Sequence, residues 1–238
     1  MLRVRPIHFT SRLDKWERLL TDLGMISTVD DGPWKEYDAG AGRLALHAAE
    51  AGSAEDGTTA FGVEVGDLAE FARRTNEAGA EGGTSPAALT QADHGDTCRI
   101  TGEDGFSFFA DKAAHGAQCA DADPALAVAE VWFSPDAAAA AQTLRNMGAR
   151  LRPVPDDDET ADFTAKNGGV LMVRPGSGAA RAGLGFEYTG DLLALRDRLA
   201  AAGHQVSMTE EAFGRTLHVA NPDGAGTDAP ALWVSARH

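Results

Sequence analysis

The chain has 238 residues, of which 43% are hydrophobic, so it can bury one large core or two ordinary ones. Its formal net charge of -15 argues against nucleic acid and anionic membranes as partners, because phosphate binding requires clustered Lys and Arg. No apolar run approaches the length of a membrane span, and no signal-peptide core is evident, so we expect a cytoplasmic protein. Cys98 and Cys119 lack metal-binding spacing and are expected to be reduced.

One helix pattern occurs four times along the chain. Each copy starts with a polar residue, places mostly apolar residues one, four, eight and eleven positions later, and is followed by a glycine. The copies begin at Arg12, Asp67, Asp136 and Asp191. They end at Gly24, Gly79, Gly148 and Gly203. The starts are 55, 69 and 55 residues apart, which predicts four modules in two pairs, each with an amphipathic helix that terminates on glycine.

Strand candidates surround each helix. A short extended segment precedes it, and these segments are 3–10, 60–65, 127–133 and 184–188. Up to three further strands bounded by turn residues follow it. These are 25–31, 34–40 and 42–49, then 97–101 and 106–111, then 149–154, 162–166 and 169–175, and finally 204–208, 215–221 and 231–236. Each module therefore predicts the order βαβββ, and the fold class is α+β.

Modules two and four match each other outside the helix as well. Both place a glycine and a glutamate before the sequence GDL, so that Glu64 corresponds to Glu187 with one inserted residue. Both also have an Asp-Gly turn between the last two strands, ending at Gly105 and Gly224. Residues 115–124 show none of these patterns and are predicted to be a linker.

A tandem βαβββ module with a helix ending in LG or AG and a late DG turn resembles the vicinal-oxygen-chelate superfamily. This superfamily includes glyoxalase I, extradiol dioxygenases and bleomycin-resistance proteins. The resemblance covers nearly the whole chain and implies four modules paired into two half-barrel domains, 1–114 and 125–238. In that family, a ligand or a metal lies in the cup between two paired modules.

The resemblance also implies where metal ligands belong. One lies on the first strand of each module, about seven residues before the helix start. These positions hold Val4 or Arg5, Thr59 or Ala60, Val128 or Ala129, and Gly183 or Leu184, none of which is a family-type ligand. The last-strand positions hold Leu46 or His47, Phe109, Leu171 or Met172, and Leu232 or Trp233. Only His47 could coordinate, so we expect no metal and no other cofactor. A displaced set of His8, His47 and Glu64 is the alternative.

His8 and Glu64 are the main candidates in the first cup. Strand alternation places both on its inward face, where they could bind a polar ligand or act as a base with its orienting acid. The alternative is a buried hydrogen bond between them that joins the half-barrels. His47 either joins them or faces solvent.

The second cup has its own candidates, which are Glu187, Glu130, Trp132 and His218. With a bulge like the one in module four, Glu130 and Trp132 face inward and Trp132 offers a stacking surface. The alternative is a core tryptophan that covers the helix. The predicted ligand-binding residues are thus His8, Glu64, His47, Glu187, Trp132 and His218.

These features favour a glyoxalase- or bleomycin-resistance-like protein that binds a small organic molecule, aromatic or cationic, without the usual metal. The alternative is a metal-dependent lyase, isomerase or dioxygenase with displaced ligands, so the sequence leaves open whether the chain is an enzyme. A third class is an interaction module whose cups are filled by side chains. Four modules already complete two cups, so either a monomer or a homodimer is compatible with the sequence.

Overall fold

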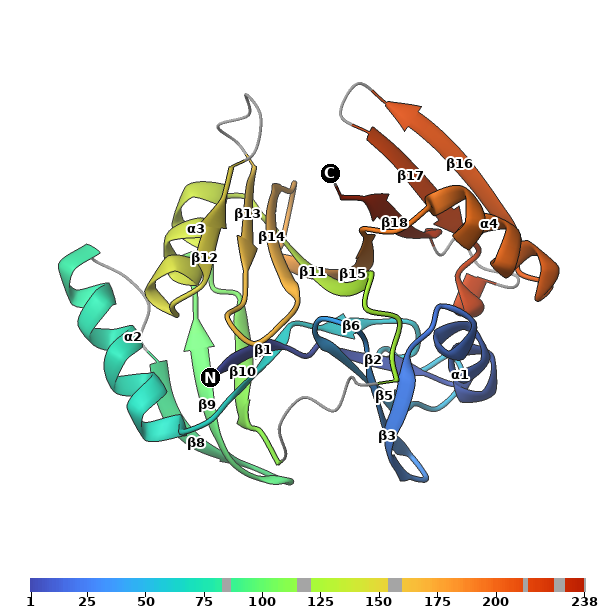
Figure 1. Ribbon diagram of the computed structural model, residues 1–238. Coiled ribbons are helices and arrows are strands. Elements are labelled where there is room, and N and C mark those ends of the chain that lie inside the picture. Colours follow the sequence, from blue (N-terminus) through green and yellow to red (C-terminus); the bar gives the residue numbers. More distant parts are fainter. Residues whose placement is uncertain (83–86, 115–120, 154–159, 212–213, 225–229, 238) are drawn as a thin grey trace. The chain divides into compact units, whose positions relative to one another are not determined.

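The structure is a computed structural model that describes residues 1–82, 87–114, 121–153, 160–211, 214–224 and 230–237 (Figure 1). Its contacts define two compact units. Unit 1 comprises Met1–Pro6, Ala60–Gly116 and Ala129–Gly183. Unit 2 comprises Ile7–Thr59, Ala117–Val128 and Leu184–His238. None of the helices in the described ranges is long and apolar enough to cross a membrane.

Unit 1 contains two helices and two sets of paired strands. The helices are α2 (Leu68–Gly82) and α3 (Ala137–Asn146). One sheet has the order β1 (Leu2–Val4), β7 (Gly62–Val65), β10 (Ser107–Lys112), β9 (Gly95–Thr101) and β8 (Ala87–Ala92). The other set has the order β12 (Arg150–Arg152), β13 (Ala161–Thr164), β14 (Val170–Pro175) and β11 (Leu126–Ser134), whose residues from Ala129 on belong to unit 1.

Unit 2 repeats this organisation. Its helices are α1 (Leu13–Asp22), α4 (Leu192–Ala201) and the short 3-10 helix η1 (Pro222–Gly224). One sheet has the order β3 (Ile26–Asp31), β4 (Trp34–Asp38), β5 (Arg43–Ala48), β2 (Ile7–Thr10) and β6 (Thr59–Ala60). The other set has the order β15 (Arg181–Tyr188), whose residues from Leu184 on belong to unit 2, then β18 (Leu232–Ala236), β17 (Gly214–Val219) and β16 (Val206–Glu211).

The predicted α+β class and all four predicted helices are confirmed. Gly24, Gly148 and Gly203 follow α1, α3 and α4 with φ of 92°, 90° and 93°, the left-handed conformation that ends a helix without a Cβ clash. The predicted end of α2 at Gly79 is wrong, because α2 continues to Gly82. Ala80, a strong helix former, follows Gly79, so the helix tolerates that glycine.

Strand β8 was not predicted. Its sequence, AALTQA, contains a single β-branched residue and no aromatic residue, so it lacks the usual strand signal. It forms because each of its residues pairs with β9 in a regular antiparallel register from Ala87–Ile100 to Ala92–Gly95. Tertiary pairing therefore determines this strand more than local propensity does.

The compact units group module two with module three, and module one with module four. The predicted domains, 1–114 and 125–238 with linker 115–124, group consecutive modules instead and stay a prediction. Residues 115–120, which include Cys119, lie outside the described residues.

The core of unit 1 contains an aromatic cluster formed by Phe61, Phe106, Phe108 and Trp132. Neighbouring rings in this cluster have centroids 4.8–6.2 Å apart, a range in which aromatic pairs attract beyond their burial. Cys98 of β9 is also fully buried, and burial raises the pKa of its thiol to about 11. This thiol is protonated at neutral pH and is therefore unreactive.

Candidate functional site

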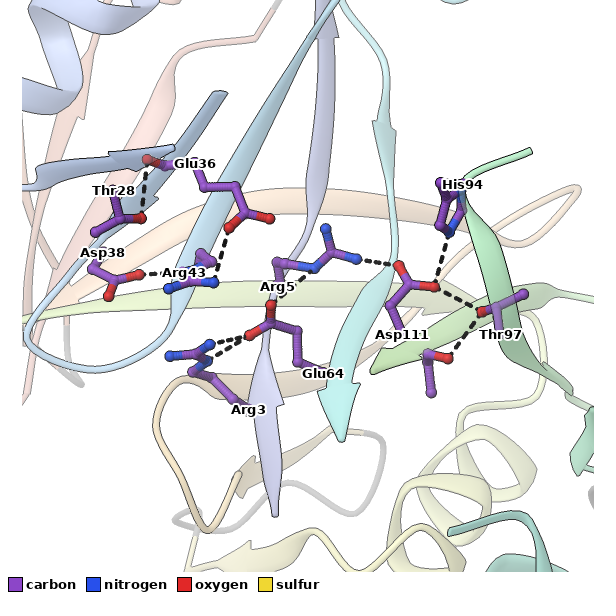
Figure 2. A network of polar contacts seen from close by, with 11 residues as sticks. Arg3, Arg5, Thr28, Glu36, Asp38, Arg43, Glu64, His94, Thr97 and Asp111 are labelled. Atoms are coloured by element: carbon purple, nitrogen blue, oxygen red, sulfur yellow. Dashed lines mark hydrogen bonds and ion pairs between the residues drawn. The ribbon is translucent and has the colours of Figure 1, made fainter. Parts of the chain in front are cut away.

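A chain of ion pairs crosses one face of the first sheet of unit 1 (Figure 2). Arg3 on β1 donates from Nε to Glu64 Oε2 on β7 over 2.6 Å, and Arg3 and Glu64 are register partners. Arg5 Nε lies 3.6 Å from Glu64 Oε1, and Arg5 Nη2 donates to Asp111 on β10. Each of these four side chains is almost fully buried, so the opposite charges compensate one another where water cannot.

Asp111 continues the chain toward the surface. It also accepts a hydrogen bond from the Thr97 hydroxyl on β9 over 2.7 Å, and His94 Nε2 lies 3.1 Å from its Oδ1. His94 occupies the turn between β8 and β9, and its side chain is 60% exposed. The inner partners Arg5 and Thr97 fix the carboxylate, which in turn orients the imidazole of His94.

A hollow of about 430 Å³ opens beside His94 and Asp111. Its other lining residues come from β9, from β10 and from the start of α2, and they are Asp67, Leu68, Asp96 and Lys112. Asp67 Oδ1 accepts the backbone N–H of Glu70 over 2.8 Å and so caps the first turn of α2. The hollow thus combines three carboxylates, one imidazole and one ammonium group.

Glu130 is a second buried carboxyl group in unit 1. It lies on β11, and the backbone N–H of Gly62 donates to its Oε1 over 2.8 Å. Its Oε2 has no hydrogen-bond partner among the described residues. Burial raises the pKa of Glu130 well above its usual value, against the opposing effects of the Gly62 N–H and the charge of Arg5. Burial therefore favours the protonated form of this carboxyl group.

The buried hydrogen bond between His8 and Glu64, the alternative for this pair, is not formed, and the role of both residues in ligand binding stays a prediction. His8 lies in unit 2. Its Nδ1 is 2.9 Å from the Thr59 hydroxyl and its Nε2 is 2.8 Å from Asp223 Oδ2, so both ring nitrogens are engaged. Its ring centroid lies 4.2 Å from that of Trp16 on α1, which places His8 on the helix side of its sheet. Burial makes His8 part of the core.

Asp223, in the late turn of module four, is the centre of this cluster. It accepts hydrogen bonds from the Thr10 hydroxyl over 2.6 Å and from Trp16 Nε1 over 2.8 Å, in addition to its contact with His8. Burial alone would raise the pKa of Asp223, but the hydrogen bonds from His8, Thr10 and Trp16 lower it below its usual value. The cluster is therefore satisfied internally.

Unit 2 has a second buried ion-pair group on another part of its first sheet (Figure 2). Arg43 on β5 is fully buried and contacts Glu36 Oε2 over 2.9 Å and Asp38 Oδ1 over 2.5 Å. Both carboxylates come from β4, which pairs with β5. No sequence motif marks this group, because its members lie on neighbouring strands.

Solved structures match the chain over nearly its full length. They include the Mn(II)-bound glyoxalase from Novosphingobium aromaticivorans, with 13% identity, a TM-score of 0.64 and coverage of 98% of this chain and 80% of that one. The 2,3-dioxygenase LapB from Pseudomonas sp. KL28 has 14% identity, a TM-score of 0.64 and coverage of 99% and 91%. Homoprotocatechuate 2,3-dioxygenase from Arthrobacter globiformis has 16% identity, a TM-score of 0.62 and coverage of 99% and 78%.

The chain has the vicinal-oxygen-chelate fold. No protein-family model matches the sequence, and no curated protein matches it either. At these identities the structural likeness establishes the fold alone, because one fold carries many activities.

The part of the chain that the structure describes offers no cluster that fits a metal of the kind bound by the Mn(II) glyoxalase. Among the described residues, no group of three or more His, Cys, Asp and Glu side chains is arranged to hold an ion. Each member of the displaced set of His8, His47 and Glu64 has another partner within its own unit. His8 has both nitrogens engaged, His47 Nδ1 lies 2.9 Å from the Ala48 carbonyl oxygen, and Glu64 is ion-paired with two arginines.

The remaining predicted residues of the vicinal-oxygen-chelate cups occupy separate environments. His47 packs between Phe9 and Trp34, with ring centroids 5.4 and 5.9 Å away. His218 Nε2 lies 3.0 Å from the Thr209 hydroxyl. Glu187 is buried and pairs in register with Ser235.

Trp132 is a core residue and not a stacking surface. It is fully buried, and its Nε1 donates to Asp104 over 2.9 Å. This was the alternative interpretation of Trp132 in the sequence.

His94, Asp111 and the Arg5 that holds Asp111 were not predicted from the sequence. A weak signal exists, since His94 lies in the turn DHGD between two strands and Asp111 ends the alternating strand FSFFAD. Nothing in the sequence shows that these two positions meet, because their contact depends on the register of β9 and β10.

Proposed function

We propose that this chain binds a small organic cation in the hollow beside His94, as a glyoxalase- or bleomycin-resistance-like protein that works without the fold's usual metal. The observation that carries the proposal is an open hollow of about 430 Å³ lined by Asp67, Asp96, Asp111 and His94. This volume falls within the roughly 300–1,000 Å³ of typical small-molecule sites.

The charges of the hollow favour a cation. Asp111 is compensated by Arg5 from inside, and Lys112 contributes one positive charge at the rim. Asp67 and Asp96 add two further carboxylates, and His94 can accept a hydrogen bond from a ligand N–H when its Nε2 donates to Asp111. The chain's net charge of -15 adds long-range attraction for cations.

The hollow is also preorganised on its inner side. Asp111 is fixed by Arg5 and Thr97, so the carboxylate does not need to be ordered when a ligand arrives. A site whose polar groups are already held in place has a lower entropic cost of binding. This supports binding of an ammonium or guanidinium group next to Asp111.

The test is calorimetric titration of the full chain with putrescine, agmatine and tetramethylammonium. We expect at least one to bind, and Asp96→Asn to weaken that binding by about three- to tenfold through loss of a nearby charge. The matched control is Asp93→Asn, an exposed aspartate of the same turn that does not line the hollow, with an expected change below about twofold.

Two results would contradict the proposal. One is equal weakening by Asp93→Asn and Asp96→Asn, which would indicate a general charge effect. The other is tight stoichiometric binding of a divalent metal, measured by elemental analysis of the purified protein, with no binding of any amine. The second result would favour the metal-dependent enzyme of the same fold.

A further inference from the structure

Strand β8 is an outer edge of the first sheet of unit 1, because β9 is its only strand partner among the described residues (Figure 1). Strands β3 and β16 hold the corresponding edges in modules one and four, and each also has six residues. Strand β3 carries the exposed Asp30 and Asp31, and its pairing with β4 shifts in register after Ser27. Strand β16 carries the exposed Glu210.

Charges and irregular register of this kind keep an edge strand from pairing with another chain. Strand β8 has neither. Its sequence, AALTQA, contains no charged residue, and its register with β9 is regular over all six residues. Of these three comparable edges, β8 is therefore the one without protection against strand addition.

The backbone of β8 also offers hydrogen bonds on its outer side. The Ala87 N–H donates to Asn76 Oδ1 on α2 over 2.7 Å, and Asn76 Nδ2 donates to the Ala87 carbonyl oxygen over 2.8 Å. The backbone groups of Ala87 thus point away from β9, and by the alternation of an antiparallel strand those of Leu89 and Gln91 do so too. Within the described ranges, no backbone group pairs with these outward groups of Leu89 and Gln91.

The side chains along this edge are accessible as well. Leu89 is 57% exposed, and Ala88, Thr90 and Gln91 are exposed beside it. Asn76 occupies the backbone of Ala87 as a neighbouring strand would, so it closes the first position of the edge. The segment open to a further strand therefore begins after Ala87.

We propose that two copies of this chain associate through β8, antiparallel about a twofold axis at Thr90. In this register, Leu89 of each copy lies opposite Gln91 of the second copy, and their outward backbone groups form two reciprocal hydrogen-bonded pairs. Thr90 lies opposite Thr90 of the second copy, a favourable cross-strand pair. Ala88 lies opposite Ala92, so no charge meets another charge.

The net charge of the chain supports a second copy as the occupant of this edge. At -15, two copies repel each other, so they associate best where neither contributes a carboxylate. Strand β8 meets this requirement and is complementary to itself. The contact is separate from the hollow beside His94, and the proposal does not rest on the proposed function.

The first experiment is sedimentation velocity of the full chain between about 10 µM and about 1 mM. We expect a reversible dimer, because an interface of one strand pair is small. Raising NaCl from about 20 mM to about 300 mM should strengthen dimerisation, since salt screens the repulsion between the copies.

Two variants test the contact itself. Gln91→Pro removes an outward N–H without removing a bond to β9, and Leu89→Lys brings two ammonium groups to diagonal positions across the axis. Each should weaken dimerisation by about tenfold or more. The matched control is Ser207→Lys, the same change in charge at an exposed residue of the β16 edge, with an expected effect below about twofold.

A disulfide tests the register. In the background Cys119→Ser, Thr90→Cys should form an intermolecular disulfide on mild oxidation, because the residues on the axis have Cα atoms about 4.5 Å apart. Ala88→Cys is the matched control, since it is exposed on the same strand but lies away from its own copy in the dimer. Circular dichroism verifies that the variants are folded.

Several outcomes would overturn the proposal. They are a monomer at every concentration and salt, dimerisation that weakens as salt is added, and equal dimerisation in the wild type and in Leu89→Lys. Disulfide formation by Ala88→Cys to the same extent as by Thr90→Cys would also overturn it, because this result would indicate random collision.

Discussion

The first strands of modules one and three can be compared residue by residue. Residues 2–10 read LRVRPIHFT and residues 126–134 read LAVAEVWFS. Each ends in a hydroxyl residue, Thr10 or Ser134, that accepts the backbone N–H two positions later, over 2.9 and 3.0 Å. The same hydroxyl donates to the aspartate of a late DG turn, Asp223 or Asp104, over 2.6 and 2.7 Å.

The ring two residues earlier also contacts that aspartate. It is His8 in module one and Trp132 in module three, with distances of 2.8 and 2.9 Å to the carboxylate. The repeat has therefore kept the aspartate, the hydroxyl and their geometry while exchanging an imidazole for an indole. What is constant is the hydrogen bond to the DG turn, and the ring that makes it can vary.

The two strands differ most in their charged residues. Arg3 and Arg5 correspond to Ala127 and Ala129, and Pro6 corresponds to Glu130. The arginines are neutralised by carboxylates of neighbouring strands, whereas burial raises the pKa of Glu130 and so favours its protonated form. The cost of burying ionisable groups is thus reduced by ion pairing for Arg3 and Arg5, and by a shift toward the protonated form for Glu130.

The comparison of the two turns predicts the largest effect. Asp223→Ala removes the partner of three buried groups, His8, Thr10 and Trp16, and should lower the free energy of unfolding by about 3–5 kcal/mol. Asp104→Ala leaves Trp132 and Ser134 unpaired and should cost less, about 1–3 kcal/mol. Calorimetric unfolding measures both, and an equal or reversed order would contradict the comparison.

The pH dependence of the same pair follows from the lowered pKa of Asp223. A group with a lowered pKa contributes stability above its unfolded pKa of about 3.8, and this contribution is lost as pH falls through the folded value. The wild-type advantage over Asp223→Ala should therefore shrink below about pH 4. An advantage that grows on acidification would show that the assignment is wrong.

Removal of the Glu64 carboxylate, which Arg3 and Arg5 share, tests the buried ion pairs of unit 1. Glu64→Leu leaves Arg3 and Arg5 buried without it, although Arg5 keeps Asp111, and should destabilise the protein by about 3 kcal/mol. The control is Glu70→Leu on α2, an exposed partner of Arg73 and Arg74, with an expected change below about 1 kcal/mol. Similar losses of stability in the two variants would mean that the buried ion pairs stabilise the protein no more than a surface ion pair does.

Substitution of Glu130 should raise the free energy of unfolding, whereas the substitutions above lower it. Glu130→Gln keeps an acceptor for the Gly62 N–H and cannot ionise, so it should stabilise the protein at pH 7 by about 1 kcal/mol or more. Because the pKa of Glu130 is raised in the folded state, its stability contribution falls as pH rises above the usual carboxyl value. Denaturant unfolding at pH 5 and pH 8 should show a larger gain at pH 8, and a larger gain at pH 5 would contradict this assignment.

The smallest effect on stability is expected at the hollow. His94→Ala removes a largely exposed side chain and its contact with Asp111, so the free energy of unfolding should change by less than about 0.5 kcal/mol. The same variant should weaken amine binding in the calorimetric titration. A stability loss above about 1 kcal/mol would indicate that His94 stabilises the fold together with the buried ion pairs and does not serve the binding site.

The helix spacing and the terminal glycines were enough to predict the fold, because each module repeats the same local signals. The environments of individual side chains were less predictable. His8 was expected to face a cup, but it lies against Trp16, since the face that a strand residue takes depends on a register that no local signal fixes. His94 and Asp111 were missed for the same reason, because only the pairing of β9 with β10 brings them together.

Cys98, buried and protonated in β9, allows the local opening of unit 1 to be measured. Its sulfur can meet an alkylating reagent only when the strands around it separate, so its modification rate counts those openings. The alkylation rate of this native thiol therefore reports how often the strands of unit 1 separate, without an introduced cysteine.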